Sequence, residues 1–120
     1  MTQQGFLLLH FFGVFLVVGS LGATTLLTLT TGSKNFKQRR MLSLGHGIGL
    51  LIVLIAGLGL MAKLGIHGAP PPWIMMKLGI WLILGILPAF IYRMPRLGKI
   101  WWGLVVLLAT YAAFLGVFKP

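Results

Sequence analysis

The 120 residues leave room for one domain, and their composition excludes an ordinary water-facing surface. Hydrophobic residues make up 58% of the chain and charged residues only 8%, whereas soluble domains usually carry about a quarter charged residues. Ten Lys and Arg face no Asp or Glu, and their clustering between apolar runs favours membrane headgroups over nucleic acid as the partner.

Four apolar runs follow one another along the chain. A bilayer core of about 30 Å needs roughly 20 apolar residues in a helix, so each run is long enough to cross a membrane. We expect transmembrane helices over residues 6–29, 41–62, 73–92 and 100–118. Because the separators are short and contain Gly or Pro, successive helices should be antiparallel neighbours. The sequence therefore predicts an all-α membrane protein, an up-down four-helix bundle with a single domain over residues 1–120.

The distribution of charge predicts the orientation of this bundle. Seven of the ten basic residues lie in or beside the first and third loops: Lys34, Lys37, Arg39, Arg40, Arg93, Arg96 and Lys99. The positive-inside rule places these loops in the cytoplasm, with the N-terminus and the C-terminus both outside. The first run has neither a basic segment before it nor a small-residue cleavage site after it, so we expect a retained helix. The predicted location is the bacterial inner membrane, with several passes.

Small residues spaced four apart indicate where helices pack closely in a membrane. The chain has three such pairs: Gly45 with Gly49, Ala109 with Ala113, and Ala112 with Gly116. We interpret them as surfaces for helix–helix contact.

Three ionisable side chains lie inside the predicted spans, namely His10, His46 and Lys77. Burying such a group costs about 3 kcal/mol on insertion scales, which makes each one a candidate for function. A fourth, His67, lies in the second loop, where a solvated interface histidine is the simpler interpretation.

The depths of these groups divide them into two sets. His10 and Lys77 each lie four residues into helices that run in the same direction, so both should sit about 6 Å below the outer boundary. His46 enters from the opposite side and should lie about 16 Å from the level of His10. His10 and His46 are therefore poor candidates to bind one metal ion together.

The residue types at the outer level suit haem chemistry. A neutral imidazole is a good ligand for haem iron, so His10 is the predicted metal ligand, and Lys77 could be a second ligand or pair with a haem propionate. The alternative is structural: Lys77 extends to the headgroups, and His10 bonds to a neighbouring helix. For His46, the glycines around it leave space for helix contact as readily as for a flat ligand.

Three stretches resemble a known group of small membrane proteins. The run LLLHFFGVFLVVGSLG is similar to the first helix of HemJ-type protoporphyrinogen oxidases and SirB-type proteins. RRMLSLGHGIGLLIVLIAGLGL is similar to their second helix, and WIMMKLGIWLILG to the tryptophan, three residues, Lys-Leu motif that opens the third. CopD-type copper-resistance domains look like more distant relatives. The resemblance covers residues 6–92.

This resemblance carries expectations about the site. Similarity to HemJ implies that His10 and Lys77 carry haem or porphyrin chemistry, and similarity to SirB implies a polar set of His10, His46 and Lys77. SirB-type second helices commonly follow their His with an Asp, and HemJ-type first helices show an Arg or Tyr where residues 23–25 are Ala and Thr. The departures favour a haem binder or accessory subunit over a complete oxidase, so enzymatic activity stays open.

We therefore carry three hypotheses for the function. The first is binding of haem b or a porphyrin for electron transfer or porphyrin handling. The second is a non-enzymatic scaffold, as a homo-oligomer or as a subunit of a larger membrane complex. The third is a small transporter, which ranks last because proton-coupled cation exporters normally need an intramembrane carboxylate. Hydrolytic chemistry has no acid/base pair and no Ser-His-Asp set to use.

Overall fold

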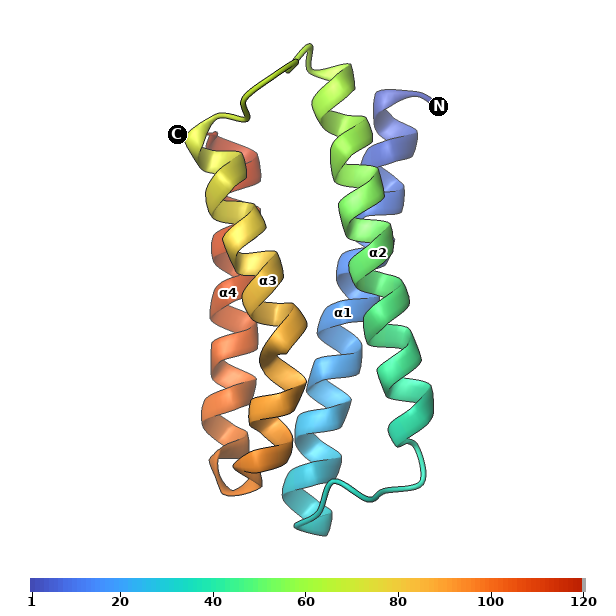
Figure 1. Cartoon of the computed structure of the whole chain (residues 1–120), viewed down its shortest axis with the longest axis vertical. Coiled ribbons are helices and arrows are strands. Elements are labelled where there is room, and N and C mark those ends of the chain that lie inside the picture. The colour runs from blue at the N-terminus through green and yellow to red at the C-terminus, as the bar shows by residue number, and fades with distance from the viewer. Residues whose placement is uncertain (120) are drawn as a thin grey trace.

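The structure is a computed structural model that describes residues 1–119, and the described residues fold entirely into helices and loops (Figure 1). The elements are α1 (Gln3–Thr31), α2 (Arg39–Lys63), α3 (Pro72–Arg93), a 3₁₀ turn η1 (Pro95–Leu97) and α4 (Gly98–Phe118). All four α-helices are long and apolar enough to cross a membrane, which confirms the four predicted helices. The residue-120 end of the predicted domain lies outside the described residues.

Successive helices run antiparallel, and the described ends of the chain lie together with the loop between α2 and α3 (Figure 1). We call this end of the molecule the terminal end. The opposite end holds residues 32–38, the η1 turn and the adjoining helix termini. We call it the basic end because seven of the ten Lys and Arg lie there.

The helices form two pairs instead of an evenly packed bundle. α1 packs against α2 and α3 packs against α4, and α1 also contacts α4 and α3. α2 and α3 are consecutive, yet they contact each other little, because the loop of residues 64–71 is long enough to join helices that stand apart. The two pairs converge toward the basic end and diverge toward the terminal end (Figure 1).

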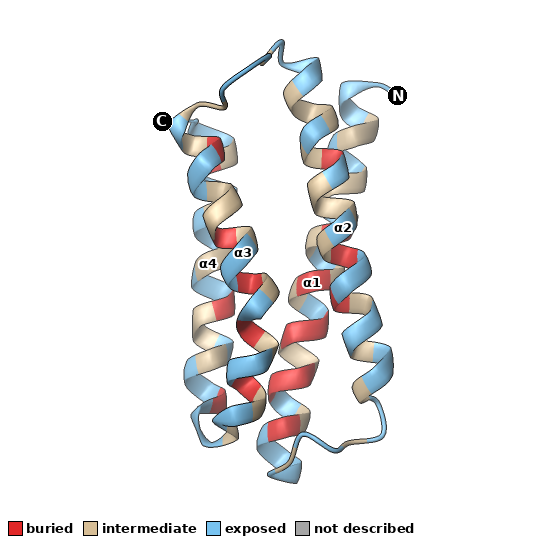
Figure 2. Ribbon diagram, viewed as in Figure 1, coloured by how far each residue is buried: buried red, intermediate tan, exposed pale blue. Residues whose placement is uncertain are grey.

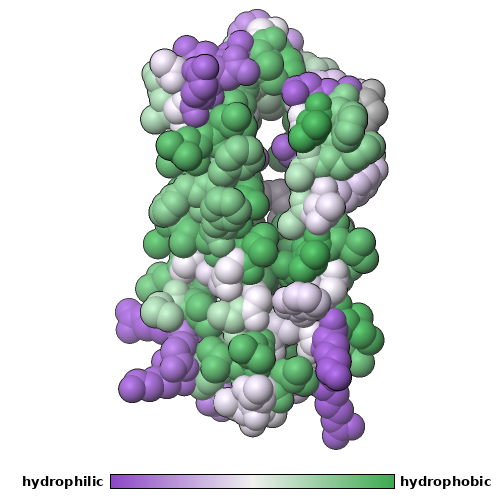
Figure 3. Space-filling model, turned by 180° about the vertical axis from the view of Figure 1, so that it is seen from behind, coloured by the Kyte–Doolittle hydropathy of each residue, from purple (hydrophilic) through white to green (hydrophobic). Residues whose placement is uncertain are grey.

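Burial follows this arrangement. Buried residues gather on α1 and α3 where the pairs converge (Figure 2). The main core cluster comprises Val17, Leu21, Ile80, Leu84, Leu87, Ile91, Val105 and Leu115. Toward the terminal end the molecule is open between the two pairs, while its sides are largely hydrophobic and its ends hydrophilic (Figure 3). The half of the bundle near the termini is therefore the loosely packed half.

Glycine brings α1 and α2 close together. A Cβ atom added at Gly49 would lie 2.9 Å from the carbonyl oxygen of Gly13, and one added at Gly45 would lie 2.8 Å from the Ser20 hydroxyl oxygen. Such distances show that the two backbones approach as closely as the missing side chains allow. The predicted packing of Gly45 and Gly49 is confirmed, whereas Ala113 on α4 is exposed.

Two buried hydroxyl groups of α1 donate hydrogen bonds within the helix itself. Thr25 donates a hydrogen bond of 2.7 Å to the carbonyl oxygen of Leu21, and the hydroxyl of Thr28 donates to the carbonyl of Thr24. A hydroxyl bonded four residues back no longer needs water, which lets these residues lie buried in an apolar helix. α1 then ends at Gly32, whose φ of 68° is a left-handed conformation that favours glycine.

Candidate functional site

His10 lies on α1 at the interface with α2. Its Nδ1 is 3.1 Å from the carbonyl oxygen of Val53, and the ring is partly buried. Because a carbonyl oxygen only accepts, Nδ1 carries the hydrogen and donates it. In the neutral ring the lone pair is then on Nε2. Metal-binding histidines are commonly oriented in this way, by a hydrogen bond from the other ring nitrogen to a carbonyl or carboxylate.

The space beside the His10 ring comes from a glycine. A Cβ atom added at Gly57 would lie 3.6 Å from the Cε1 atom of His10 and 3.7 Å from its Nδ1. These are ordinary contact distances, so the Nδ1–Cε1 edge of the ring lies against a helix surface that has no side chain there. The ring is thus held by one hydrogen bond on one side and by backbone contact on another.

Lys77 lies on α3 at the other helix pair. Its ammonium is next to Gly116 of α4, where an added Cβ atom would lie 3.1 Å from the Nζ atom. The charge is near enough to interact electrostatically with the His10 ring and with the Lys119 ammonium. Lys119 also donates a hydrogen bond of 2.8 Å to the carbonyl oxygen of Gly116 and lies 5.7 Å from the centre of the Trp73 ring. In the terminal-end half of the molecule, Lys77 therefore lies between the His10 imidazole and a second cation, Lys119.

His46 has a different environment, in the narrow contact between α2 and α3. Its Nε2 donates a hydrogen bond of 2.9 Å to the carbonyl oxygen of Leu84, and the residue is only 9% exposed. In return, the Trp81 indole of α3 donates a hydrogen bond of 3.0 Å to the carbonyl oxygen of Leu50. Each helix thus gives one ring N–H to the backbone of the other. We interpret His46 as a structural link between helices.

Trp81 is the polar residue that the sequence analysis missed. Its indole N–H lies in mid-span, and a buried indole N–H usually finds an acceptor. The need of this N–H for an acceptor could have marked Trp81 in the sequence. A largely apolar ring among apolar neighbours, however, does not stand out as a polar residue. Since α2 and α3 contact each other little, the hydrogen bonds of Trp81 and His46 are the main connections between these two helices.

Replacing Trp81 with phenylalanine should therefore lower the free energy of unfolding by about 1 kcal/mol, the usual size of such a bond within a membrane. The substitution keeps the ring and removes the N–H donor. Trp102→Phe is the matched control, because that indole is 58% exposed and donates no hydrogen bond among residues 1–119. Unfolding in detergent, followed by circular dichroism, measures both variants. Equal stabilities would contradict the linking role of Trp81.

The predicted site residues lie in three separate parts of the structure. His10 lies seven residues after the start of α1 and Lys77 five residues after the start of α3, so both lie toward the terminal end, on opposite helix pairs and near each other. His46 precedes the His10 acceptor Val53 by seven residues, about 10 Å along α2. His67 is exposed in the loop between α2 and α3. Within residues 1–119, no three side chains of the His, Cys, Asp and Glu types gather where they could hold a metal ion.

No protein-family model, no curated protein and no solved structure matches this chain. The similarity to HemJ-type and SirB-type proteins therefore rests on the sequence motifs and stays a prediction.

Proposed function

We propose that this chain binds haem b or a related porphyrin between its helix pairs, in the half of the bundle near the termini. His10 is the proposed axial ligand, through Nε2. The observation that carries the proposal is the hydrogen bond from Nδ1 of His10 to the carbonyl oxygen of Val53. This bond fixes the ring and leaves the other nitrogen for a further ligand.

The electrostatics favour an anionic ligand in that place. Lys77 lies near both His10 and Lys119, and the chain contains no carboxylate side chain that could balance these two lysines. A porphyrin with two propionate groups is apolar over most of its surface and carries two negative charges at one edge. In this proposal Lys77 pairs with a propionate, since a lysine in an apolar span is stable only with a counter-charge or a path to the headgroups.

The residues present fit such a group in three respects. The imidazole of His10 is oriented by a backbone carbonyl, Gly57 leaves the surface beside it flat, and Lys77 supplies a cation across the opening. Bound haem would supply a one-electron iron centre, whose potential depends on its axial ligands. The chain itself would orient the imidazole, hold the ligand's negative edge and exclude water with apolar helix walls. His46 has no part in this proposal, because it is only 9% exposed and lies in the narrow contact between α2 and α3.

The membrane orientation belongs to the same proposal. We place the basic end in the cytoplasm and the terminal end outside, in a bacterial inner membrane, because seven of the ten basic residues lie at the basic end. The proposed ligand would then lie in the outer half of the bilayer.

Titration of the purified chain in lipid nanodiscs tests the proposed function. Ferric haem and iron-free protoporphyrin are added separately, with empty nanodiscs as the control because both partition into lipid. We expect saturable binding of one ligand per chain and, for haem, a shifted Soret band with b-type bands after reduction. Binding of iron-free protoporphyrin alone would support porphyrin handling without iron ligation. If neither ligand bound above the level of the empty nanodiscs, the proposal would be wrong.

One specific observation favours a second function, as a subunit that docks other membrane helices. Each helix carries a glycine with no atom within 4 Å of an added Cβ atom: Gly19, Gly47, Gly79 and Gly103. Such positions let another backbone approach closely. An accessory subunit would bind neither porphyrin in the titration, so the same experiment separates the two functions.

A further inference from the structure

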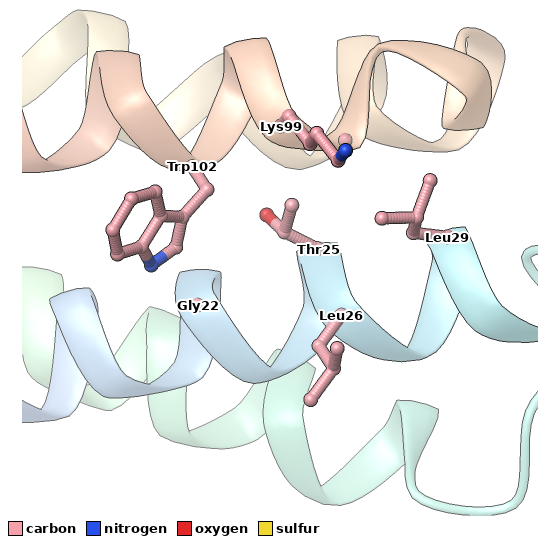
Figure 4. A pocket seen from close by; sticks show the side chains of 7 residues that line it. Gly22, Thr25, Leu26, Leu29, Lys99 and Trp102 are labelled. Atoms are coloured by element: carbon pink, nitrogen blue, oxygen red, sulfur yellow. The ribbon is translucent and has the colours of Figure 1, made fainter.

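A groove lies between α1 and α4 near the basic end, far from the proposed porphyrin site. Its volume is about 300 Å³. It is lined by Gly22, Thr25, Leu26, Leu29, Gly98, Lys99 and Trp102 (Figure 4). In Figure 4 the Trp102 ring extends from α4 toward α1, Lys99 lies above Thr25, and Leu29 lies at the end of the groove away from Trp102.

Close packing at one end and a missing side chain at the other produce the groove. At its basic end, an added Cβ atom on Gly98 would lie 3.0 Å from the Leu29 Cβ atom, so α4 starts in direct contact with α1. Further along α1, an added Cβ atom on Gly22 would meet nothing within 4 Å. The helices therefore touch at Gly98, and a furrow opens between them beside Gly22.

The groove is lined mainly by apolar groups. Its one hydroxyl, on Thr25, already donates to the carbonyl oxygen of Leu21 and needs no further partner as a donor. Leu26 and Trp102 are 60% and 58% exposed. In a bilayer these side chains face lipid tails, so an acyl chain is the natural filling.

Two cations stand at the basic end of the groove. A second hollow of about 380 Å³ is lined by Leu29, Gly32, Pro95 and Arg96, and it adjoins the groove because both include Leu29. Arg96 and Lys99 are exposed, and the chain has no Asp or Glu to pair with them. An apolar furrow thus leads to two unneutralised cations at the level where lipid phosphates lie.

We propose that this groove is a binding site for one anionic phospholipid, such as phosphatidylglycerol. An acyl chain lies along Gly22 and Trp102, and the phosphate pairs with Arg96 and Lys99. Both the shape and the charge of the groove favour this ligand. A neutral lipid would not neutralise Arg96 and Lys99, and a soluble anion would not fill the apolar furrow. The proposal is independent of porphyrin binding, since it uses other residues at the other end of the molecule.

Native mass spectrometry of the full chain, released from an equimolar mixture of phosphatidylglycerol and phosphatidylcholine, tests the charge. The wild type should retain one phosphatidylglycerol molecule selectively. The double variant R96Q/K99Q should lose affinity about fivefold per removed charge, or roughly 25-fold. The double variant K34Q/K37Q is the matched control, with the same change in net charge at the same end, and it should bind as the wild type does. Equal losses in the two variants would mean general charge attraction and would overturn the site.

A second pair of variants tests the furrow itself. Gly22→Leu should fill the groove and remove the selective lipid, while the chain still folds because the space is open. Gly19→Leu, on the same helix and also facing open space, should retain the lipid. Retention in the Gly22 variant would overturn the proposal, as would competition by inorganic phosphate at millimolar concentration. Quenching of Trp102 fluorescence by brominated phosphatidylglycerol provides a second measurement, in a chain whose other three tryptophans are replaced by Phe. Quenching should be strong with Gly19→Leu and weak with Gly22→Leu.

Discussion

Replacing Gly49 with alanine should lower the free energy of unfolding by about 1–3 kcal/mol, the usual penalty for adding a methyl group to a filled interface. The added Cβ atom would lie 2.9 Å from the Gly13 carbonyl oxygen and 2.9 Å from the Leu16 Cβ atom. The first is a backbone atom and the second is fixed to the backbone, so neither can rotate away. α1 would have to move off α2. Unfolding in detergent, followed by circular dichroism, measures the loss.

Gly47→Ala is the control for this prediction. It makes the same chemical change two residues earlier on α2, with the same effect on helix propensity, and its Cβ atom would meet nothing within 4 Å. We expect no loss of stability. If the two alanine variants unfolded alike, the glycine contact would not be what holds α1 against α2.

Replacing His10 with alanine should lower haem affinity by at least about 100-fold, because losing the ligand should cost no less than losing a group that orients one. The Soret and reduced α bands of the nanodisc complex should disappear with it. Free imidazole should restore the bands in part, since it supplies the missing nitrogen without the chain's own side chain. Absorption spectra with and without imidazole provide the measurement.

His46→Ala is the matched control for the His10 variant. It removes an imidazole of the same chemistry whose Nε2 is bonded to Leu84, so haem binding should persist while the link between α2 and α3 is lost. An unchanged spectrum for the His10 variant would falsify axial ligation by this residue. Equal loss in both variants would point to general destabilisation instead.

The four helices could be predicted from the sequence because hydrophobic length alone decides them. Each observed helix contains its predicted run and extends it by one to three residues at most of its ends. The pairing of the helices was harder to predict. Apolar side chains surround each helix on all sides, so the sequence carries no stripe that marks the buried face. Short loops suggested that α2 and α3 would pack as neighbours, whereas the loop of residues 64–71 holds them apart.

Small residues gave a partial signal for the contact surfaces. Gly45 and Gly49 were predicted to pack and do so against α1, but Ala109 and Ala113 look equivalent in sequence and Ala113 is exposed. A small residue permits close approach without requiring it. Whether a pair of small residues packs against another helix depends on the residues of that helix. Gly13 on α1 allows close approach to Gly49, whereas Ala113 stays exposed.

The residues of the candidate site could be predicted from the sequence, but their contacts could not. His10, His46 and Lys77 stand out because ionisable groups are rare in spans. Their hydrogen-bond acceptors are backbone carbonyls on other helices, and every residue has such a carbonyl. The sequence therefore does not reveal that His46 is buried in the contact between α2 and α3, whereas His10 is only partly buried at the contact between α1 and α2. The sequence predicted that the two histidines lie at different depths. Only the structure shows which helices surround each of them.

The division into two helix pairs has a consequence for biogenesis. The most extensive contact joins neighbours in sequence, α1 with α2, so this hairpin can insert into the bilayer and close on itself before α3 and α4 arrive. Assembly then proceeds by docking of the second hairpin, through contacts of α3 and α4 with α1 and through two ring N–H groups offered to backbone carbonyls. Chains made as separate halves, residues 1–66 and 67–120, would carry all the surfaces that this docking step needs.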